Sequence, residues 1–336
     1  MLKKVLRATA ALSLLLSPLS WAAEPQTVRI AYQSGEINVL LSYAQGAGLF
    51  AKHGLKAELT AFPAGPAILP ALAGNKVDLG WMGEMPAVTG YSNGIPLEVL
   101  LMERKDETNI RLSAKPEAAA SLAELKGKRV AASIGSSSHY HLLQALKAGG
   151  LTQNDISLVN LPPVNMPPAY AAGQIDAALT WEPAIGEIEQ QGARTLATTR
   201  SLNMITGGYW VGHQRFSREQ PEALQAFLAV WNEAQQDYAA DPARVRRYEA
   251  ERIGQTPEQF DALIERQSAS HPSLTEQVTP DYLGQPGEQL NSRLMAHFQS
   301  IGQFLVAQER ISAVPSDWSG LFNPPPVQTF LQARQK

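Results

Sequence analysis

VRIAYQSGEINVLLSYAQGAGLFAKHGLKAELT, residues 28–60, is the stretch of sequence that decides the fold. Its two ends, at 28–32 and 56–60, carry the short apolar runs typical of β-strands, and residues 39–50 carry apolar side chains at helical spacing. The helical pattern ends near Gly54, a residue type that commonly follows a helix. A helix between two strands forms a β-α-β unit, which joins parallel strands of one sheet. The stretch therefore predicts an α/β fold with an open, mostly parallel sheet.

The same alternation continues along the chain in two series. The first series goes on with a helix at 66–73, a strand at 77–81, a helix at 86–92 and a strand at 97–101. The second has strands at 129–133, 156–160 and 177–181, helices at 138–148 and 167–172, and an end near 196–199. Polar stretches at 103–108 and 199–206 flank the second series, and the pattern is helical from Glu219 onward. We therefore expect two α/β lobes with a ligand cleft between them, lobe one at 24–106 and 207–336 and lobe two at 107–206.

The first 22 residues predict a cleavable signal peptide and export to the periplasm. Lys3, Lys4 and Arg7 make a basic segment, an apolar run follows at 8–19, and the small-x-small triplet at 20–22 is a signal-peptidase pattern. The apolar run is too short to cross a bilayer core of about 30 Å. The sequence has no cysteine, so neither a disulfide nor a lipid anchor on cysteine is expected.

The charge balance excludes two classes of partner. Removal of the three basic residues of the signal peptide leaves 25 basic against 31 acidic residues, a net charge near −6. Nucleic acid and anionic membrane surfaces are therefore not expected as partners. An anionic ligand would have to be recognised by local dipoles rather than by the field of the whole protein.

In open α/β sheets, ligands bind beyond the carboxyl ends of the strands, where loops lead into helix N-termini. Six such turns occur, three in each series: 33–36, 63–66, 82–86, 135–140, 162–165 and 181–183. If both sheets direct these ends at one cleft, the turns converge there.

The turn at 135–140, Gly-Ser-Ser-Ser-His-Tyr, is the best candidate anion site. A glycine and three serines at a helix start offer free backbone N–H groups and hydroxyl donors, with the positive end of the helix dipole behind them. This combination suits a tetrahedral anion held without a full countercharge. The alternative is that Ser137 or Ser138 only caps the helix.

Two acidic and two aromatic residues stand at other strand ends. Glu84 and Glu182 each come just before a helix, where a carboxylate favours the helix dipole. They could also accept a hydrogen bond from a ligand amine or hydroxyl, or act as partners across the cleft. Trp81 and Trp181 each end a strand and could wall the apolar part of a ligand, with core packing as the alternative for Trp81.

The sequence offers no catalytic, metal or cofactor site. A Gly-x-Ser-x-Gly elbow would need glycine where His139 stands, and no phosphate-binding glycine motif occurs. His139 and His141 are the one close pair of histidines, and two positions apart they point to different sides of a helix. Glu251 and Arg252, in the C-terminal helices, are predicted to lie on solvated faces. An enzyme built on this fold is the rival hypothesis, and these residues provide few groups that could catalyse a reaction.

At these same turns the sequence resembles a known family. The matching residues are Ile-Ala-Tyr-Gln at 30–33, Phe-Pro-Ala-Gly-Pro at 62–66, Val-Asp-Leu-Gly at 77–80 with Gly83, Glu84 and Pro86, Gly-Ser-Ser-Ser-His at 135–139, and Trp-Glu-Pro at 181–183. They are similar to the periplasmic aliphatic sulfonate-binding proteins and, more broadly, to the taurine-, nitrate- and thiamine-precursor-binding proteins of ABC importers. The likeness spans Val28 to about Phe227.

The resemblance implies a type II periplasmic-binding fold and a monomeric receptor without cofactor, which closes on a small organic anion and delivers it to an ABC permease and its ATPase. Together with the strand-end turns, it gives the candidate ligand-binding residues: Gln33, Ser34, Glu36, Gly65, Gly83, Glu84, Met85, Ser136, Ser137, Ser138, His139, Tyr140, Trp181 and Glu182.

The sequence departs from the family at the first turn. Ser34 and Glu36 stand where the family often has lysine and serine. The loss of a cation and the gain of a carboxylate favour taurine, a sulfate ester or another amine-bearing anion over a simple alkanesulfonate. A nitrate-type ligand or a pyrimidine thiamine precursor, recognised by Trp181 and the carboxylates, is the alternative.

Overall fold

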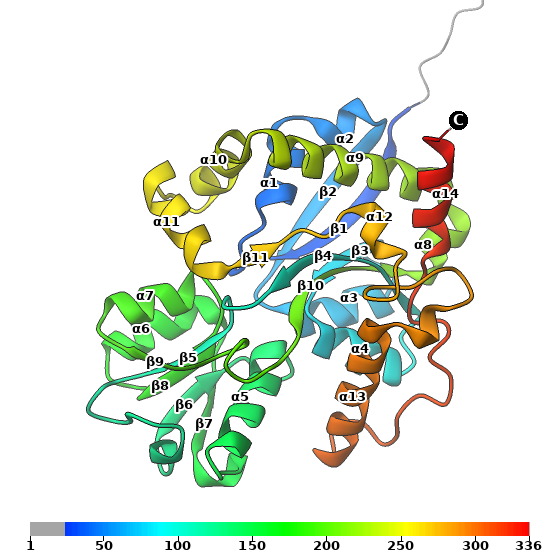
Figure 1. Ribbon diagram of the computed structural model, residues 1–336. Coiled ribbons are helices and arrows are strands. Elements are labelled where there is room, and N and C mark those ends of the chain that lie inside the picture. Colours follow the sequence, from blue (N-terminus) through cyan, green and yellow to red (C-terminus); the bar gives the residue numbers. More distant parts are fainter. Residues whose placement is uncertain (1–23, 336) are drawn as a thin grey trace, which may run out of the picture.

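The computed structural model describes residues 24–335 and confirms the α/β class (Figure 1). The predicted signal peptide, residues 1–22, lies outside the described residues. The strands form one six-stranded and one five-stranded sheet, with helices packed around both. Among residues 24–335, no helix has the length and apolar character needed to cross a membrane.

The six-stranded sheet has the order β11-β4-β10-β3-β1-β2. Its strands are β1 (Gln26–Gln33), β2 (Leu55–Phe62), β3 (Leu79–Met82), β4 (Leu97–Asp106), β10 (Thr206–His213) and β11 (Ala269–Ser270). β1 pairs parallel with β2 and β3, as the β-α-β pattern predicts, whereas β10 runs antiparallel between β3 and β4. The connecting helices are α1 (Val39–Gly46), α2 (Leu49–Lys52), α3 (Leu69–Ala73) and α4 (Glu84–Ser92).

Two predicted helices differ from expectation for local reasons. The helix expected at 39–50 is divided into α1 and α2, because Gly48 at the break takes a left-handed φ of 73°. The helix expected at 66–73 begins as a 3₁₀ turn, Gly65–Ile68, before α3. Pro70 in α3 has no N–H to donate to the preceding turn, which favours the tighter start.

The five-stranded sheet has the order β7-β6-β8-β5-β9. Its strands are β5 (Arg111–Ala114), β6 (Arg129–Ala132), β7 (Ser157–Asn160), β8 (Ala177–Thr180) and β9 (Arg194–Thr198), and its helices are α5 (Ser137–Ala148), α6 (Met166–Ala171) and α7 (Ala184–Gln190). β6 pairs parallel with β7 and β8, and β5 pairs antiparallel with β8 and β9. Further 3₁₀ turns lie at Ala123–Leu125, Gln153–Asp155, Pro163–Asn165 and Gln289–Asn291.

The chain crosses between the sheets twice, after β4 and before β10. These two strands are neighbours, with Thr206 paired to Asp106, so the two crossings lie side by side. We propose that the lobes are divided at these crossings, with lobe one at 24–106 and 207–336 and lobe two at 107–206.

The C-terminal helices cover the six-stranded sheet. They are α8 (Gln214–Glu219), α9 (Pro221–Ala240), α10 (Pro242–Arg252), α11 (Pro257–Gln267), α12 (Leu274–Gln277), α13 (Arg293–Ala307) and α14 (Pro325–Ala333). α9, α10 and α14 pack with α1 over one core, where Trp210, Phe227 and Trp231 form an aromatic cluster. α13 and α4 enclose the second core. Near the C-terminal end of α13, the ring of Phe304 packs edge-to-face on Tyr140 of α5, so lobe one also contacts lobe two outside the crossings.

Candidate functional site

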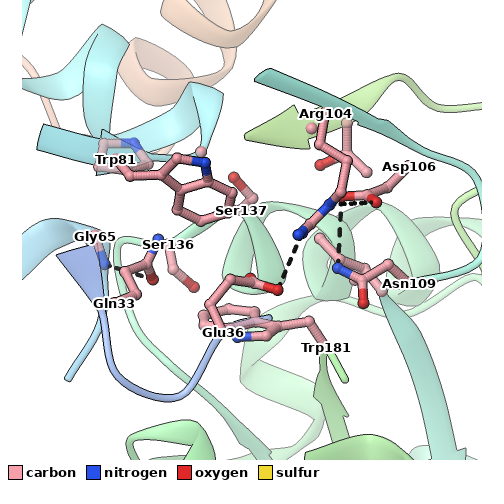
Figure 2. Close-up of a pocket in the computed structure, with 15 residues that line it drawn as sticks. Gln33, Glu36, Gly65, Trp81, Arg104, Asp106, Asn109, Ser136, Ser137 and Trp181 are labelled. Atoms are coloured by element: carbon pink, nitrogen blue, oxygen red, sulfur yellow. Dashed lines mark hydrogen bonds and ion pairs between the residues drawn. The ribbon is translucent and has the colours of Figure 1, made fainter. Parts of the chain in front are cut away.

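A pocket lies between the two sheets, at the strand ends where the predicted turns converge (Figure 2). In this closed arrangement its cavity volume is about 30 Å³, far below the volume of an open ligand site, so a ligand can enter only when the lobes move apart. Residues from the six-stranded sheet and its loops line one side: Gln33, Glu36, Gly65, Trp81, Gly83, Pro86, Arg104, Asp106, Thr206 and Gly207. Residues from the other lobe face them: Asn109, Ile110, Ser136, Ser137 and Trp181.

The N-termini of α4 and α5 meet in this pocket from opposite lobes. Their N-cap residues are Gly83 and Ser136, and neither makes a side-chain capping hydrogen bond. The two ends are so close that a Cβ atom at Gly83 would stand 2.3 Å from Ser137 Oγ. Uncapped N–H groups and two aligned helix dipoles make this end of the pocket suitable for an anion.

The serine turn supports this arrangement. Gly135 takes a left-handed φ of 83°, which favours glycine. The Ser136 hydroxyl donates to the Ser133 carbonyl at 2.6 Å and lies 2.9 Å from Ser138 Oγ. Because Ser136, rather than Ser137 or Ser138, occupies the N-cap and its hydroxyl turns back into the loop, the first N–H groups of α5 keep their hydrogen-bonding capacity.

Two carboxylates surround one buried arginine elsewhere in the lining of the pocket. Arg104 of β4 donates to Glu36 Oε1 at 3.0 Å, to Asp106 Oδ1 at 2.8 Å and to the Ile37 carbonyl at 2.8 Å (Figure 2). Its guanidinium also lies 5.3 Å from the ring centroid of Trp81. Burial raises the pKa of Glu36 to about 7, although the Arg104 charge acts in the other direction. With both carboxylates ionised, this cluster carries one excess negative charge.

Helix α10 holds the Glu36 loop in place from outside the pocket. Glu249 is buried, accepts the Asn38 N–H at 2.7 Å and also accepts the Ser42 hydroxyl. Arg252 pairs with Glu249 at 2.6 Å and donates to the Glu36 carbonyl at 2.9 Å. Arg252 is exposed, as predicted, although one of its partners, the Glu36 carbonyl, belongs to a loop more than two hundred positions away in the sequence.

Two contacts tie further turns together. Gln33 Oε1 accepts the Gly65 N–H at 2.9 Å, which joins the first two turns of lobe one. Trp181 of lobe two donates from Nε1 to the Gly35 carbonyl at 2.9 Å, and this buried hydrogen bond crosses between the lobes. Trp181 therefore lines the pocket and also stabilises the closed arrangement of the two lobes.

Seven of the predicted site residues line the pocket, namely Gln33, Glu36, Gly65, Gly83, Ser136, Ser137 and Trp181. Glu84 is buried directly behind the lining, where its Oε1 accepts the Thr206 hydroxyl at 3.0 Å. Ser34 is exposed, with its hydroxyl 3.3 Å from the Phe62 carbonyl.

The other predicted residues make contacts outside the pocket, either within one lobe or between the lobes. Met85 belongs to the lobe-one core, and Ser138 is bonded to Ser136. His139 lies 3.2 Å from the Gln153 side chain, and its burial lowers its pKa. Tyr140 packs on α13, away from the pocket. Glu182 is paired with Arg111 at 2.6 Å and with Arg266 at 3.4 Å.

Sequence reasoning missed the pocket residues contributed by the crossings: Arg104, Asp106, Asn109, Ile110, Thr206 and Gly207. The polar stretches at 103–108 and 199–206 were the available signal, because they mark where the chain passes the mouth of the cleft. Within residues 24–335, no group of three or more histidine, aspartate or glutamate side chains is placed to hold a metal ion.

Comparison with known proteins finds both sequence and structural relatives. A family model described as the NMT1-like family matches residues 21–254. The taurine-binding periplasmic protein of Escherichia coli (strain K12) is 32% identical over 231 residues, which are 63% of this chain and 70% of that protein. The alkanesulfonate-binding protein from Xanthomonas axonopodis pv. citri, solved bound to MOPS, is 26% identical, with a TM-score of 0.70 over 91% of this chain and 99% of that one.

A more distant structural neighbour is an enzyme. The desulfurization enzyme DSZB is 15% identical, with a TM-score of 0.61 over 92% of this chain and 99% of that one. That likeness shows the fold alone. The predicted periplasmic-binding fold is confirmed by the sulfonate-binding neighbour, which matches nearly the whole chain.

Proposed function

The chain belongs to the NMT1-like family, and from this membership and the pocket we propose that it is the periplasmic solute-binding component of an ABC importer for a small organosulfur anion. The observation that carries the proposal is the meeting of two uncapped helix N-termini, from opposite lobes, in one pocket. A sulfonate or sulfate group placed there would receive backbone N–H donors from both lobes and would hold them together. The taurine-binding relative supports this choice of ligand class.

The acidic end of the pocket indicates a ligand that also carries an amine. Glu36 and Asp106 are two carboxylates on one guanidinium, so one excess negative charge faces the pocket when Glu36, whose pKa burial raises to about 7, is ionised. An ammonium group would neutralise it, whereas the tail of a simple alkanesulfonate would leave it buried and uncompensated. A compact zwitterion such as taurine therefore fits both ends. A pyrimidine thiamine precursor could stack on Trp81 or Trp181, but it would leave the helix N-termini without an anion.

The mechanism is closure of the two lobes about the crossings at 107–110 and 199–205. Ligand contacts from both lobes stabilise the closed state, which the Trp181 hydrogen bond to Gly35 also favours. An ABC permease would then recognise the closed form and receive the ligand. We propose no chemical step, and the ligand is expected to leave the pocket unchanged.

Isothermal titration of the wild type with taurine and with ethanesulfonate tests the proposal. Taurine should bind more tightly, and it should be recovered unchanged after incubation, which separates a receptor from an enzyme. Glu36→Gln should weaken taurine binding by about 10-fold or more, the value of a charge-assisted hydrogen bond, and should spare ethanesulfonate. Glu98→Gln, which alters a buried carboxyl of β4 outside the pocket, is the control.

The outcomes separate the parts of the proposal. Failure of both sulfonates to bind the wild type would refute the ligand class. An equal loss for both ligands in Glu36→Gln would refute the placement of the amine while leaving the anion site at α4 and α5 intact.

A further inference from the structure

Two buried polar atoms behind the anion end of the pocket have no partner among the described residues. They are Glu84 Oε2, at the start of α4 in lobe one, and Ser137 Oγ, at the start of α5 in lobe two. Glu84 is fully buried, and its other oxygen already accepts the Thr206 hydroxyl. Ser137 lines the pocket, and its hydroxyl lies against Gly83, the residue before Glu84. An unpaired buried polar atom costs about 1–3 kcal/mol, so these two neighbours call for a common explanation.

Among the described residues, no positive charge is one of the main influences on the Glu84 carboxyl. The cation of the pocket, Arg104 on β4, is paired with Glu36 and Asp106. The titratable groups near it are Tyr140 and His141 on α5, Tyr209 on β10 and His297 on α13, which packs on α4. Burial lowers the pKa of both histidines to about 4, so they are neutral at pH 7. Burial in turn raises the pKa of Glu84 to about 7, against the smaller influence of the polar groups around it, which include its own backbone, the Thr206 hydroxyl and the nearby Ser137 hydroxyl.

We propose, on the basis of the proposed function, that Glu84 is a positioning residue that carries a proton in the ligand complex. Its Oε2–H donates to Ser137 Oγ, and the Ser137 hydroxyl then donates to the anionic group of the ligand. Both unpartnered atoms are satisfied in this arrangement. An ionised Glu84 would instead accept a hydrogen bond from the Ser137 hydroxyl. A lone pair of Ser137 Oγ would then face the anion and repel it.

The arrangement makes ligand uptake proton-linked. A sulfonate carries no proton at neutral pH, so the proton on Glu84 must come from solvent when the anion enters. The bound anion also disfavours the charged carboxylate, which raises the pKa of Glu84 further. Affinity is therefore full below pH 7 and falls as the pH rises through 7. With a free-state pKa of about 7, linkage gives an affinity about 10-fold weaker at pH 8 than at pH 6.

The test is titration calorimetry of taurine and ethanesulfonate between pH 6 and 8, in phosphate and in Tris. These buffers differ in ionisation enthalpy, so the comparison reports the protons taken up for each ligand bound. Because Glu36 also titrates near neutrality, the readout is the difference between the wild type and Glu84→Gln. We expect the wild type to take up about one more proton than the variant at pH 8. Glu84→Gln should flatten the pH profile but keep binding, since its amide can donate to Ser137 Oγ as the neutral acid does.

Glu98→Gln is the matched control for this substitution. Glu98 is likewise a buried glutamate of lobe one with an unpartnered oxygen and a pKa raised by burial, but it lies near Ser217 and Asn323 rather than at the pocket. The control should bind and take up protons like the wild type. Equal uptake by wild type and Glu84→Gln, or loss of binding in a folded Glu84→Gln, would overturn the inference. A wild-type affinity for ethanesulfonate that is constant from pH 6 to 8 would overturn it even if the variant did not fold, because protonation of Glu36 and of Glu84 both favour that ligand. Absence of binding by the wild type would refute the proposed function and this inference with it.

Discussion

Gly83→Ala is expected to hinder closure of the lobes without disturbing either lobe. Gly83 has φ −76° and ψ 175°, an extended conformation that alanine adopts without strain. The obstacle lies in the other lobe, because the new Cβ would stand 2.3 Å from Ser137 Oγ and 3.3 Å from Ser137 Cβ. The clash exists only when α4 and α5 meet, so the open form should be unaffected.

The expected loss of taurine affinity follows from how far the new Cβ atom would overlap Ser137. Ordinary contacts of this kind begin near 3.4 Å, so the Oγ overlap exceeds 1 Å, and Ser137 must rotate or α5 must move. Overpacking of this degree costs about 1–3 kcal/mol in a well-packed site. Since the cost falls on the closed, ligand-bound state alone, taurine binding should weaken roughly 5- to 150-fold.

Titration calorimetry gives the affinity, and small-angle scattering gives the ligand concentration needed for compaction. The matched background is Ser137→Ala, which removes the atom involved in the worst contact. That substitution weakens anion binding by itself, so the informative quantity is the coupling in the double-mutant cycle. Gly83→Ala should cost at least about 1 kcal/mol less in the Ser137→Ala background than in the wild type.

Two results would refute this reasoning. One is an unchanged taurine affinity in Gly83→Ala, which would mean that the two helix N-termini do not meet in the liganded protein. The other is an equal loss in both backgrounds, which would place the effect within lobe one. Thermal unfolding of the free variant should match the wild type, and a lowered midpoint would likewise point to damage inside lobe one.

Three further predictions follow from the same geometry. Trp181→Phe keeps an aromatic wall but removes the hydrogen bond to the Gly35 carbonyl, so taurine should bind about 5-fold more weakly through faster dissociation, measured by stopped-flow fluorescence. Burial lowers the pKa of His141 and His297 to about 4 from 6.5. Their neutral burial therefore stabilises the fold above pH 6.5, and this stabilisation is lost as the pH falls toward 4, by up to about 3 kcal/mol for each. Urea unfolding between pH 7 and 4 measures that loss, which His297→Gln should reduce. Glu249→Gln should lower the free energy of unfolding by about 2–3 kcal/mol, because it breaks a buried ion pair that holds the first pocket loop.

The β-α-β units could be predicted from the sequence because their signals are local, but strand β10 could not. It contains Gly207, Gly208 and Gly212, and glycine weakens a strand prediction. The structure shows why two of them are required. A Cβ at Gly208 would stand 1.9 Å from the Trp81 ring, and one at Gly207 would stand 2.0 Å from the Arg104 carbonyl. These neighbours lie a hundred or more positions away, so no local pattern could reveal the need for glycine.

The serine turn at 135–140 shows which features of a site a local sequence pattern can predict and which it cannot. Its location and its glycine follow from the sequence, and Ser136 and Ser137 line the pocket as predicted. The next residues of α5 do not, because each position on a helix is rotated by about 100° from the one before. Ser138 faces back to the loop, and Tyr140 faces α13. Which side of the helix meets the pocket depends on how α5 packs, which is a tertiary property.

Arg104 and Glu36 together explain why an acidic pocket can serve an anion. From the sequence, Glu36 is an unfavourable neighbour for a sulfonate, and Arg104 is a charged residue at the end of a strand. In the structure they form one buried cluster with Asp106, which lines the same pocket as the uncapped helix N-termini. The anion is therefore met by N–H dipoles, and the carboxylates meet whatever the anion is attached to. A monofunctional sulfonate gives the carboxylates no cation, so Glu36, whose pKa burial raises to about 7, must take up a proton or remain as a buried charge without a partner. Discrimination in favour of a zwitterion thus arises from the ion pair that only an ammonium group forms, and this is why Glu36→Gln, which removes that ion pair, should weaken taurine, spare ethanesulfonate and narrow the gap between them.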